Sequence, residues 1–540
     1  MAVLIKLQRA GLRLFQSLER LLGHVFREFN NPFYSLGALA FYFFYIIVGS
    51  GIYLFIFYEP SIKGSFDTVD YLTHEQWYFG GIMRSLHRYA SDALVLVMVL
   101  HILREFTLDR YRGARWFTWV TGFPALLLIF SSGLIGYWLV WDTLGQYIAV
   151  RSTEWLDWLP IFSEPSARNF LTNSSVSDLF FRLILIGHIA ISIFLFVALL
   201  VHVKNISKAI TSPPRNLAVG TFLCLLILSL ALPAVSQERA DLSQVPGIIH
   251  IDWFYMFAYP LMDHWSMGGV WALVAVITLL LLFLPWLPPQ RHRPVAKVLL
   301  EKCSGCSLCV MDCPYEAIIL QPRTDGHPSY VREAAVVADN CVGCGICTGA
   351  CPFSRPPRGE ELLTTGIDVP SRDIQHLYRA SALALEALRS NTKVLVYGCD
   401  HGVALDSLAI EDVAVVSLPC TAALPASFIG YMLRHGADGI FLTGCRRGDC
   451  YHRLGNIWVE QRLSLDHQSR PHLPRWIPRQ RIGYYWAGLD DERPLIRAID
   501  RFQKGLHDFS AANNGQHEED SLPDPVSIQG TRKQVSSEKH

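Results

Sequence analysis

The chain has 540 residues, 51% of them hydrophobic, and its 47 basic and 47 acidic side chains give a formal net charge of zero. This length predicts more than one domain, and the balanced charge gives no indication of a nucleic-acid partner. The apolar residues are unevenly distributed: residues 36–288 resemble membrane segments in composition, and residues 290–540 resemble a soluble protein.

Residues 1–30 mix apolar and basic side chains, which predicts an amphipathic helix on a membrane surface. Charge interrupts the apolar positions throughout, so a signal peptide is not expected. Six apolar segments follow, each about 20 residues or more, the length that an approximately 30 Å hydrocarbon core requires. These predicted spans are residues 36–58, 83–106, 117–141, 180–203, 216–236 and 265–288.

The connections between these segments alternate in charge. Those on one side are basic and include Arg112, Lys204 and Lys208, whereas those on the other side are mainly acidic. Because basic connections stay in the cytoplasm, we expect a multi-pass protein of the inner membrane. Both termini and the soluble domains would then be cytoplasmic.

Two of the predicted spans carry histidines at identical spacing. His87 and His101 are fourteen residues apart, and so are His188 and His202. Fourteen residues are nearly four turns of an α-helix and a rise of about 21 Å, so each helix presents two imidazoles on one side at two depths. The orientation puts His87 and His188 at the outer level and His101 and His202 at the inner level.

Three explanations of these histidines are open: polar contacts between helices, zinc binding and haem binding. Matched pairs make simple contacts a poor explanation, and two imidazoles at each level make a poor zinc site. Two b-type haems, each with two axial histidines, fit the pattern best.

Three motifs carry a resemblance to cytochrome b of quinol-oxidising bc complexes. They are Arg84-Ser-Leu-His87-Arg-Tyr, Thr118-Trp-Val-Thr-Gly122 and Gly133-Leu-Ile-Gly136-Tyr. The resemblance covers roughly residues 30–290 and implies a dihaem membrane domain over 31–290. It also implies four glycines that let helix backbones approach the porphyrins: Gly37, Gly51, Gly122 and Gly136. By the family's roles, arginines would pair with the haem propionates, and the candidates are Arg84, Arg104 and Arg115; the other interpretation is ordinary positive-inside anchoring.

The chain also departs from this family. The outer quinol-site motif Pro-Glu-Trp-Tyr is reduced to Ile251-Asp252-Trp253-Phe254. Asp252 is a candidate acid for a quinol proton, the other interpretation being a simple interface acid. Six spans are fewer than bc-type cytochromes carry, so two haems are expected but a full bc-type quinone cycle is not.

Twelve of the 13 cysteines follow residue 300, and the first eight have a cluster spacing, which indicates a reducing compartment. Residues 303–314 and 341–352 are two copies of the bacterial ferredoxin run, in which the fourth cysteine of each copy binds the other cluster. One [4Fe-4S] cluster is therefore assigned to Cys303, Cys306, Cys309 and Cys351, and the second to Cys341, Cys344, Cys347 and Cys313. Zinc is the weaker alternative.

Four later cysteines follow or come near predicted parallel strands: Cys399, Cys420, Cys445 and Cys450. The carboxyl ends of such strands form a common site, where four thiolates can hold a [2Fe-2S] cluster; buried structural thiols are the alternative. The segment Thr443–Asn456 resembles the delta subunit of methyl-viologen-reducing hydrogenase. That resemblance implies a [2Fe-2S] cluster and electron transfer to a heterodisulfide-reductase-like flavoprotein. The family's second cysteine after the first strand is Gly402 here, which makes the ligand set less certain.

The predicted fold class is thus multi-domain: an α-helical membrane bundle, a small α+β ferredoxin-like domain over 300–356 and an α/β parallel-sheet domain over 357–508. The polar residues 509–540 are expected to be disordered. The predicted function is an electron-transfer subunit of a quinone-linked oxidoreductase, in the order [2Fe-2S], two [4Fe-4S], inner haem, outer haem, quinone. Its soluble partner would be the flavoprotein or dehydrogenase or hydrogenase subunits. The alternatives are a bc-type quinol-oxidising cytochrome b with a Rieske partner and a non-catalytic redox sensor or membrane anchor.

Overall fold

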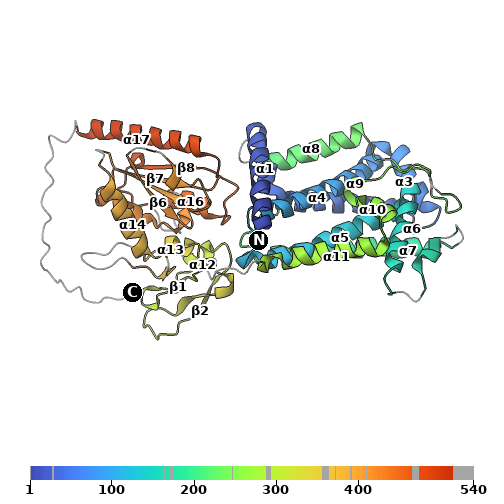
Figure 1. Cartoon of the computed structure of the whole chain (residues 1–540), viewed down its shortest axis with the longest axis horizontal. Helices are drawn as coiled ribbons and strands as arrows, with labels where there is room; N and C mark the ends of the chain where they lie inside the picture. Colours follow the sequence, from blue (N-terminus) through green and yellow to red (C-terminus); the bar gives the residue numbers. More distant parts are fainter. Residues whose placement is uncertain are drawn as a thin grey trace, which may run out of the picture.

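The computed structural model describes residues 2–26, 30–161, 164–170, 172, 175–245, 247–287, 294–354, 364–370, 372–389, 392–408, 410, 412–464 and 473–514. A bundle of long helices forms one half of the molecule, and the soluble domains lie at one end of it (Figure 1). The multi-domain fold class is therefore confirmed.

Within the described residues, five helical segments are long and apolar enough to cross a membrane: Pro32–Phe57, Trp77–Thr107, Gly113–Val140, Asp178–Val203 and Met267–Trp286. Their regular helices are α2 (Leu36–Phe57), α4 (Ile82–Thr107), α5 (Trp116–Val140), α7 (Asp178–Val203) and α11 (Met267–Phe283). Large apolar side chains point outward from α7, where Ile186 and Phe194 are 62% and 64% exposed. Such a surface suits lipid rather than water.

The predicted span over 216–236 is shorter than expected. Its helix α8 (Arg215–Ala231) has only 17 residues, below the roughly 20 that a full crossing needs. It ends because Leu232 precedes Pro233, and a residue before proline disfavours the helical conformation.

Two helix pairs form the centre of the bundle, α2 with α4 and α5 with α7. Short helices cover the end far from the soluble domains: α3 (Gly64–His74), α6 (Thr143–Asp157), α9 (Trp253–Met256) and α10 (Tyr259–His264). The predicted amphipathic segment forms α1 (Ala2–Phe26), which lies across the opposite end of the bundle (Figure 1). A buried ion pair between Glu19 and Arg104, with 2.8 Å between Oε1 and Nε, joins α1 to α4.

The ferredoxin-like domain consists of β1 (Lys297–Val298), α12 (Leu308–Asp312), β2 (Ile318–Pro322), β3 (Arg332–Val336), α13 (Ile346–Ala350) and β4 (Ile367–Asp368). Strands β2 and β3 pair antiparallel, as do β1 and β4. The pairing of β4 with β1 brings residues beyond the predicted boundary at residue 356 back against the ferredoxin-like domain.

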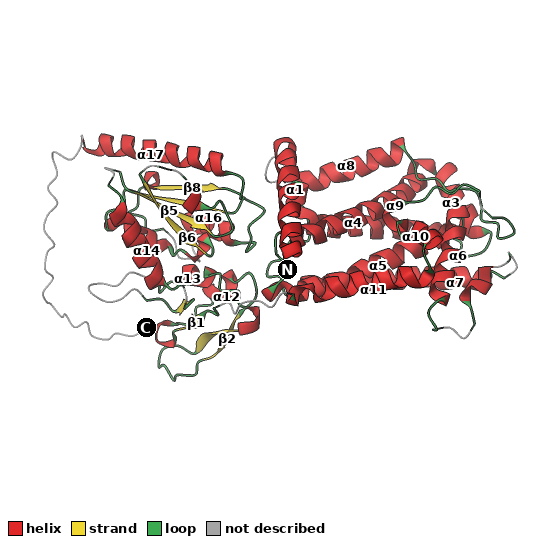
Figure 2. Cartoon of the chain, viewed as in Figure 1, coloured by secondary structure: helices red, strands yellow, loops and turns green. Residues whose placement is uncertain are grey.

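The last domain contains a parallel sheet in the order β6-β5-β7-β8. Its strands are β5 (Val394–Cys399), β6 (Val413–Leu418), β7 (Gly439–Gly444) and β8 (Ile482–Trp486), and its helices are α14 (Ile374–Ala387), α15 (Ala426–Arg434), α16 (Gly455–Leu463) and α17 (Glu492–Asn514). The central strands β5 and β7 are completely buried between helices (Figure 2). Helix α17 continues six residues into the predicted disordered tail, whose remainder, 515–540, lies outside the described residues.

Candidate metal centres

We call the two histidines farther from the soluble domains, His87 and His188, the outer pair, and we call His101 and His202 the inner pair. The two outer histidines face each other across the bundle. His87 on α4 and His188 on α7 have ring centroids 6.3 Å apart. With a metal–imidazole bond of about 2.0 Å, two opposed imidazoles on one ion place their centroids roughly 6 Å apart. The outer pair is therefore spaced to hold a single metal between the rings.

Hydrogen bonds fix the orientation of these imidazoles. Nδ1 of His87 lies 3.0 Å from the carbonyl oxygen of Ile47, and Nδ1 of His188 lies 3.0 Å from that of Ser132. A carbonyl only accepts, so each Nδ1 donates and each Nε2 is left with its lone pair for a metal. At the inner level, Nδ1 of His202 lies 3.3 Å from the Thr121 hydroxyl.

Each of the four histidines lies against one of the four glycines named from the sequence. A Cβ on Gly51 would lie 3.0 Å from Cε1 of His87, and a Cβ on Gly37 would lie 3.6 Å from Cε1 of His101. The corresponding distances from Gly136 to His188 and from Gly122 to His202 are 3.4 and 3.3 Å. Helices α2 and α5 thus supply the glycines, while α4 and α7 supply the histidines.

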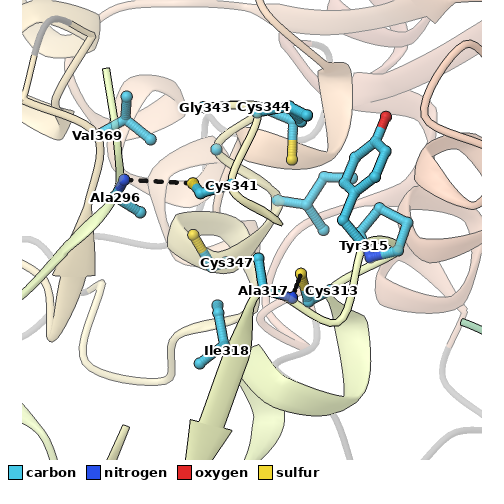
Figure 3. Close-up of a pocket in the computed structure, with 14 residues that line it drawn as sticks. Ala296, Cys313, Tyr315, Ala317, Ile318, Cys341, Gly343, Cys344, Cys347 and Val369 are labelled. Carbon is cyan, nitrogen blue, oxygen red and sulfur yellow. Dashed lines mark hydrogen bonds between the residues drawn. The ribbon is translucent and has the colours of Figure 1, made fainter. Parts of the chain in front are cut away.

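Two hollows of similar size lie in the ferredoxin-like domain. The second hollow, drawn in Figure 3, contains Cys313, Cys341, Cys344 and Cys347. The first hollow contains Cys303, Cys306, Cys309 and Cys351. Each hollow therefore gathers three cysteines from one ferredoxin run and the fourth from the other, which are the two sets assigned from the sequence.

Backbone amides point at several of these sulfurs. Ala317 donates to Sγ of Cys313 at 3.3 Å, and Ala296 donates to Sγ of Cys341 at 3.4 Å (Figure 3). Hydrogen bonds to sulfur stabilise bound thiolates and adjust cluster potentials. Burial, followed by the neighbouring thiols, raises the pKa of Cys309 to about 12, so positive iron would be needed to keep this sulfur ionised.

The four later cysteines also come together, at the carboxyl edge of the sheet. The sulfurs of Cys399 and Cys445 are 4.0 Å apart. A Cβ on Gly455 would lie 2.5 Å from Sγ of Cys420 and 3.3 Å from Sγ of Cys450, so glycine leaves room for both thiols. We call this group the four-cysteine centre.

The spacing of the cysteines bears on the kind of metal. Among the described residues, no three His, Cys, Asp or Glu side chains converge closely enough to hold a single ion. Zinc requires such convergence, with sulfurs about 2.3 Å from one point. In a [4Fe-4S] cluster each thiolate binds a different iron, and in a [2Fe-2S] cluster the four thiolates are divided between two irons, so a wider arrangement fits.

Comparisons with known protein families agree with this division of the chain. Residues 24–210 match the family model for cytochrome b/b6/petB. The membrane half contains a cytochrome b domain. Residues 302–354 match a 4Fe-4S dicluster domain, and residues 397–509 match the delta subunit of methyl-viologen-reducing hydrogenase. The chain is accordingly a membrane electron-transfer subunit that combines cytochrome b with iron–sulfur domains.

A solved structure entitled "Hyperthermophilic respiratory Complex III" is also similar. It is 21% identical, the alignment covers 47% of this chain and 75% of that chain, and the TM-score is 0.40.

The three arginines proposed from the cytochrome b resemblance all have protein partners. Arg84 donates to the hydroxyls of Thr73 and Ser236. Arg104 is buried between Glu19 of α1 and Asp449 of the sheet domain, and Arg115 donates to Tyr315 and to the carbonyl of Tyr451. Arg104 and Arg115 therefore join the cytochrome b domain to the soluble domains, and their pairing with propionates stays a prediction.

Asp252 lies in a buried ionic group at the outer end of the cytochrome b domain. Its carboxylate accepts from Tyr137 and pairs with Arg88, and it caps α9 by accepting from the amide of Phe254 at 2.9 Å. Arg88 also lies 3.6 Å from Asp92. Two carboxylates thus share one guanidinium.

Several residues of these centres were not predicted from the sequence. Ser50, Thr121 and Ser132 contact histidine Nδ1 atoms, and their one signal is a position within a turn of the paired glycines. Gly366 lies against the first cluster hollow, where a Cβ would be 3.2 Å from Sγ of Cys351. Its role depends on the pairing of β4 with β1, for which the sequence has no local signal.

Proposed function

We propose that this chain is a subunit of a quinone-linked oxidoreductase complex that carries electrons between a cytoplasmic redox partner and the quinone pool. The carriers would be two b-type haems, two [4Fe-4S] clusters and one [2Fe-2S] cluster. The observation that carries the proposal is the series of metal-type sites that extends from His87 and His188 through the inner histidines to the cysteine centres.

The positions of the arginines support a cytoplasmic location for the soluble domains. Arg104, Arg110 and Arg115 lie at the same end of the bundle as these domains, and all three contact them. Basic residues of this kind are retained on the cytoplasmic side. The partner there would be a heterodisulfide-reductase-like flavoprotein, or dehydrogenase or hydrogenase subunits, as the delta-subunit match suggests.

Asp252 supports a quinone site at the outer end. Proton exchange at this carboxylate requires its contact with Arg88 to loosen, and Asp92 lies close enough to take the guanidinium. Asp252 can thus take up a proton while Arg88 keeps Asp92 as its partner. This matters because an unpaired charge in the membrane is costly.

Purification of the complex from native membranes tests the function. Optical haem determination should give two b haems per chain, iron and sulfide analysis with EPR should give three clusters, and mass spectrometry should identify the soluble partner. Fewer than two haems, or no iron–sulfur signal, would refute the proposal. A Rieske protein in the preparation, with inhibition by outer-site quinol inhibitors, would favour a bc-type cytochrome. Unchanged function in His101→Leu would favour the sensor or anchor.

A further inference from the structure

The loop 445–453 of the sheet domain is seated on the inner end of the cytochrome b domain. Oδ1 of Asp449 lies 2.8 Å from Nη2 of Arg104 and 2.9 Å from Nη2 of Arg110. Arg453 donates to the carbonyls of Ser207 and Lys208 at 2.8 and 3.1 Å. The loop therefore contacts the membrane-side residues that follow both inner histidines.

These contacts link the four-cysteine centre to the inner haem position by a short path. Asp449 directly precedes Cys450, and its partner Arg104 follows His101 by three residues. This ion pair is buried, with only 5% of the Arg104 side chain and 19% of the Asp449 side chain exposed. Arg104 also pairs with Glu19 and Asp449 also pairs with Arg110, so a network of four charges holds the loop against the inner end of the bundle.

A second contact lies beside the first. Arg115, which precedes α5, donates to the carbonyl oxygen of Tyr451, the residue that follows Cys450. The residues on both sides of Cys450 are therefore bonded to the cytochrome b domain.

The ferredoxin hollows lie beyond this centre. Cys344 packs against the hydrophobic cluster that contains Cys420, so the hollow of the second [4Fe-4S] cluster adjoins the four-cysteine centre. Cys309 and Cys347 lie in one buried cluster, which places the first hollow next, and its Cys306 is exposed. The ferredoxin-like domain has a membrane-side contact of its own, because Tyr315 accepts from Arg115 at 3.3 Å; Tyr315 is also close to Cys344.

We propose, on the basis of the proposed function, that the four-cysteine centre is the carrier that exchanges electrons directly with the inner haem, and that loop 445–453 positions it there. This order differs from the one expected from the sequence, in which the ferredoxin clusters stood next to the haem. Each step moves one electron between two metal centres and makes or breaks no bond. Two such electrons, with two protons from water, convert one quinone to quinol. The soluble partner then exchanges electrons at the exposed Cys306 end.

The first experiment compares Cys420→Ser with Cys344→Ser in the full chain, reconstituted in nanodiscs. Deazaflavin photochemistry supplies electrons, haem absorbance is followed in time, and freeze-quench EPR reports the clusters. Cys420→Ser should slow haem reduction by about tenfold or more while the ferredoxin signals still develop. If Cys420→Ser reduces haem at the wild-type rate and Cys344→Ser does not, the route through Tyr315 operates and the proposal is wrong.

The second experiment does not depend on turnover and keeps every cysteine. Asp449→Asn removes a negative charge beside both centres, which should raise the midpoint potentials of the inner haem and the four-cysteine centre together. The outer haem and the first ferredoxin cluster should keep theirs. Asp325→Asn, on the surface of the ferredoxin-like domain, is the control. It should change neither the potential of the inner haem nor that of the four-cysteine centre. Unchanged inner-haem potential in Asp449→Asn would overturn the proposal, whereas absence of haems or clusters from the wild type would refute the proposed function instead.

Discussion

Gly51 faces the ring of His87 so closely that a Cβ at this position would lie 3.0 Å from Cε1. The same relationship recurs at all four histidines, always between a glycine of α2 or α5 and a histidine of α4 or α7. The glycines thus leave space at the height of each imidazole, where a flat macrocycle bound through the histidines has to lie.

Gly51→Val should abolish outer-haem binding, because the branched side chain would occupy the space beside His87. Haem content should fall by about half, with the inner haem retained. The measurement is a pyridine haemochrome assay together with low-temperature optical spectra of purified protein.

Gly49→Val is the matched control for this substitution. Gly49 lies on the same helix, and a Cβ there meets nothing within 4 Å. Equal haem loss in both variants would show that the effect comes from the helix and not from the space at His87.

Asp252→Asn should reduce quinol-linked electron transfer while leaving haem content unchanged. If Asp252 exchanges the quinol proton, its loss costs a factor of roughly 10² to 10⁴, and Arg88 retains Asp92 as a partner. The rate is measured as haem reduction by quinol, with dithionite-reduced spectra as a check on loading. Asp67→Asn, at an exposed ion pair with Arg239, should keep the wild-type rate; a full rate in Asp252→Asn would show that Asp252 is not the acid.

The extent of correct prediction depends on how local each signal is. The histidine pairs and the ferredoxin runs are encoded by spacing within one segment, so the helices that carry the histidines and the gathering of each cysteine set were predictable. The four-cysteine centre was predictable because parallel strands end at a common edge.

Contacts between domains had no such signal. Arg104 and Asp449 are 345 positions apart, and nothing in either segment indicates the other. The same holds for β4, whose two residues pair with β1 across the ferredoxin-like domain. The predicted span over 216–236 was too long for another reason. Apolar residues continue past Ala231, but Pro233 ends the helix.

The cysteines of the first ferredoxin hollow should differ in reactivity after the clusters are removed. Burial and neighbouring thiols raise the pKa of Cys309 to about 12, so at pH 8 only about one in 10⁴ of these thiols is ionised. Cys306 is exposed and should be alkylated first by iodoacetamide. Peptide mass spectrometry over time checks the order, and raising the pH should accelerate alkylation of Cys309. Simultaneous labelling of both cysteines would mean that cluster removal unfolds the domain.

A buried ion pair couples the two soluble domains. Nη2 of Arg462 lies 3.0 Å from Oδ2 of Asp312, and both side chains are only 3% exposed. Arg462 also donates to the carbonyl of Ala422 at 2.6 Å, while the indole of Trp458 donates to the backbone of Asp312 at 3.0 Å. The second ferredoxin hollow and the four-cysteine centre are therefore held together beside this contact.

Asp312→Ala should destabilise the junction by about 3–5 kcal/mol, because it leaves the Arg462 guanidinium buried without its carboxylate. The double variant Asp312→Leu with Arg462→Met removes both charges and should recover most of this loss. Asp490→Ala is the surface control, since its contact with Arg20 is 3.9 Å long and largely exposed, and it should cost less than about 1 kcal/mol. Thermal unfolding of the full chain, followed by iron–sulfur absorbance, measures all three. If Asp312→Ala lowers the transition no more than Asp490→Ala, the ion pair does not couple the domains, and the spacing of the two centres must depend on the backbone contacts alone.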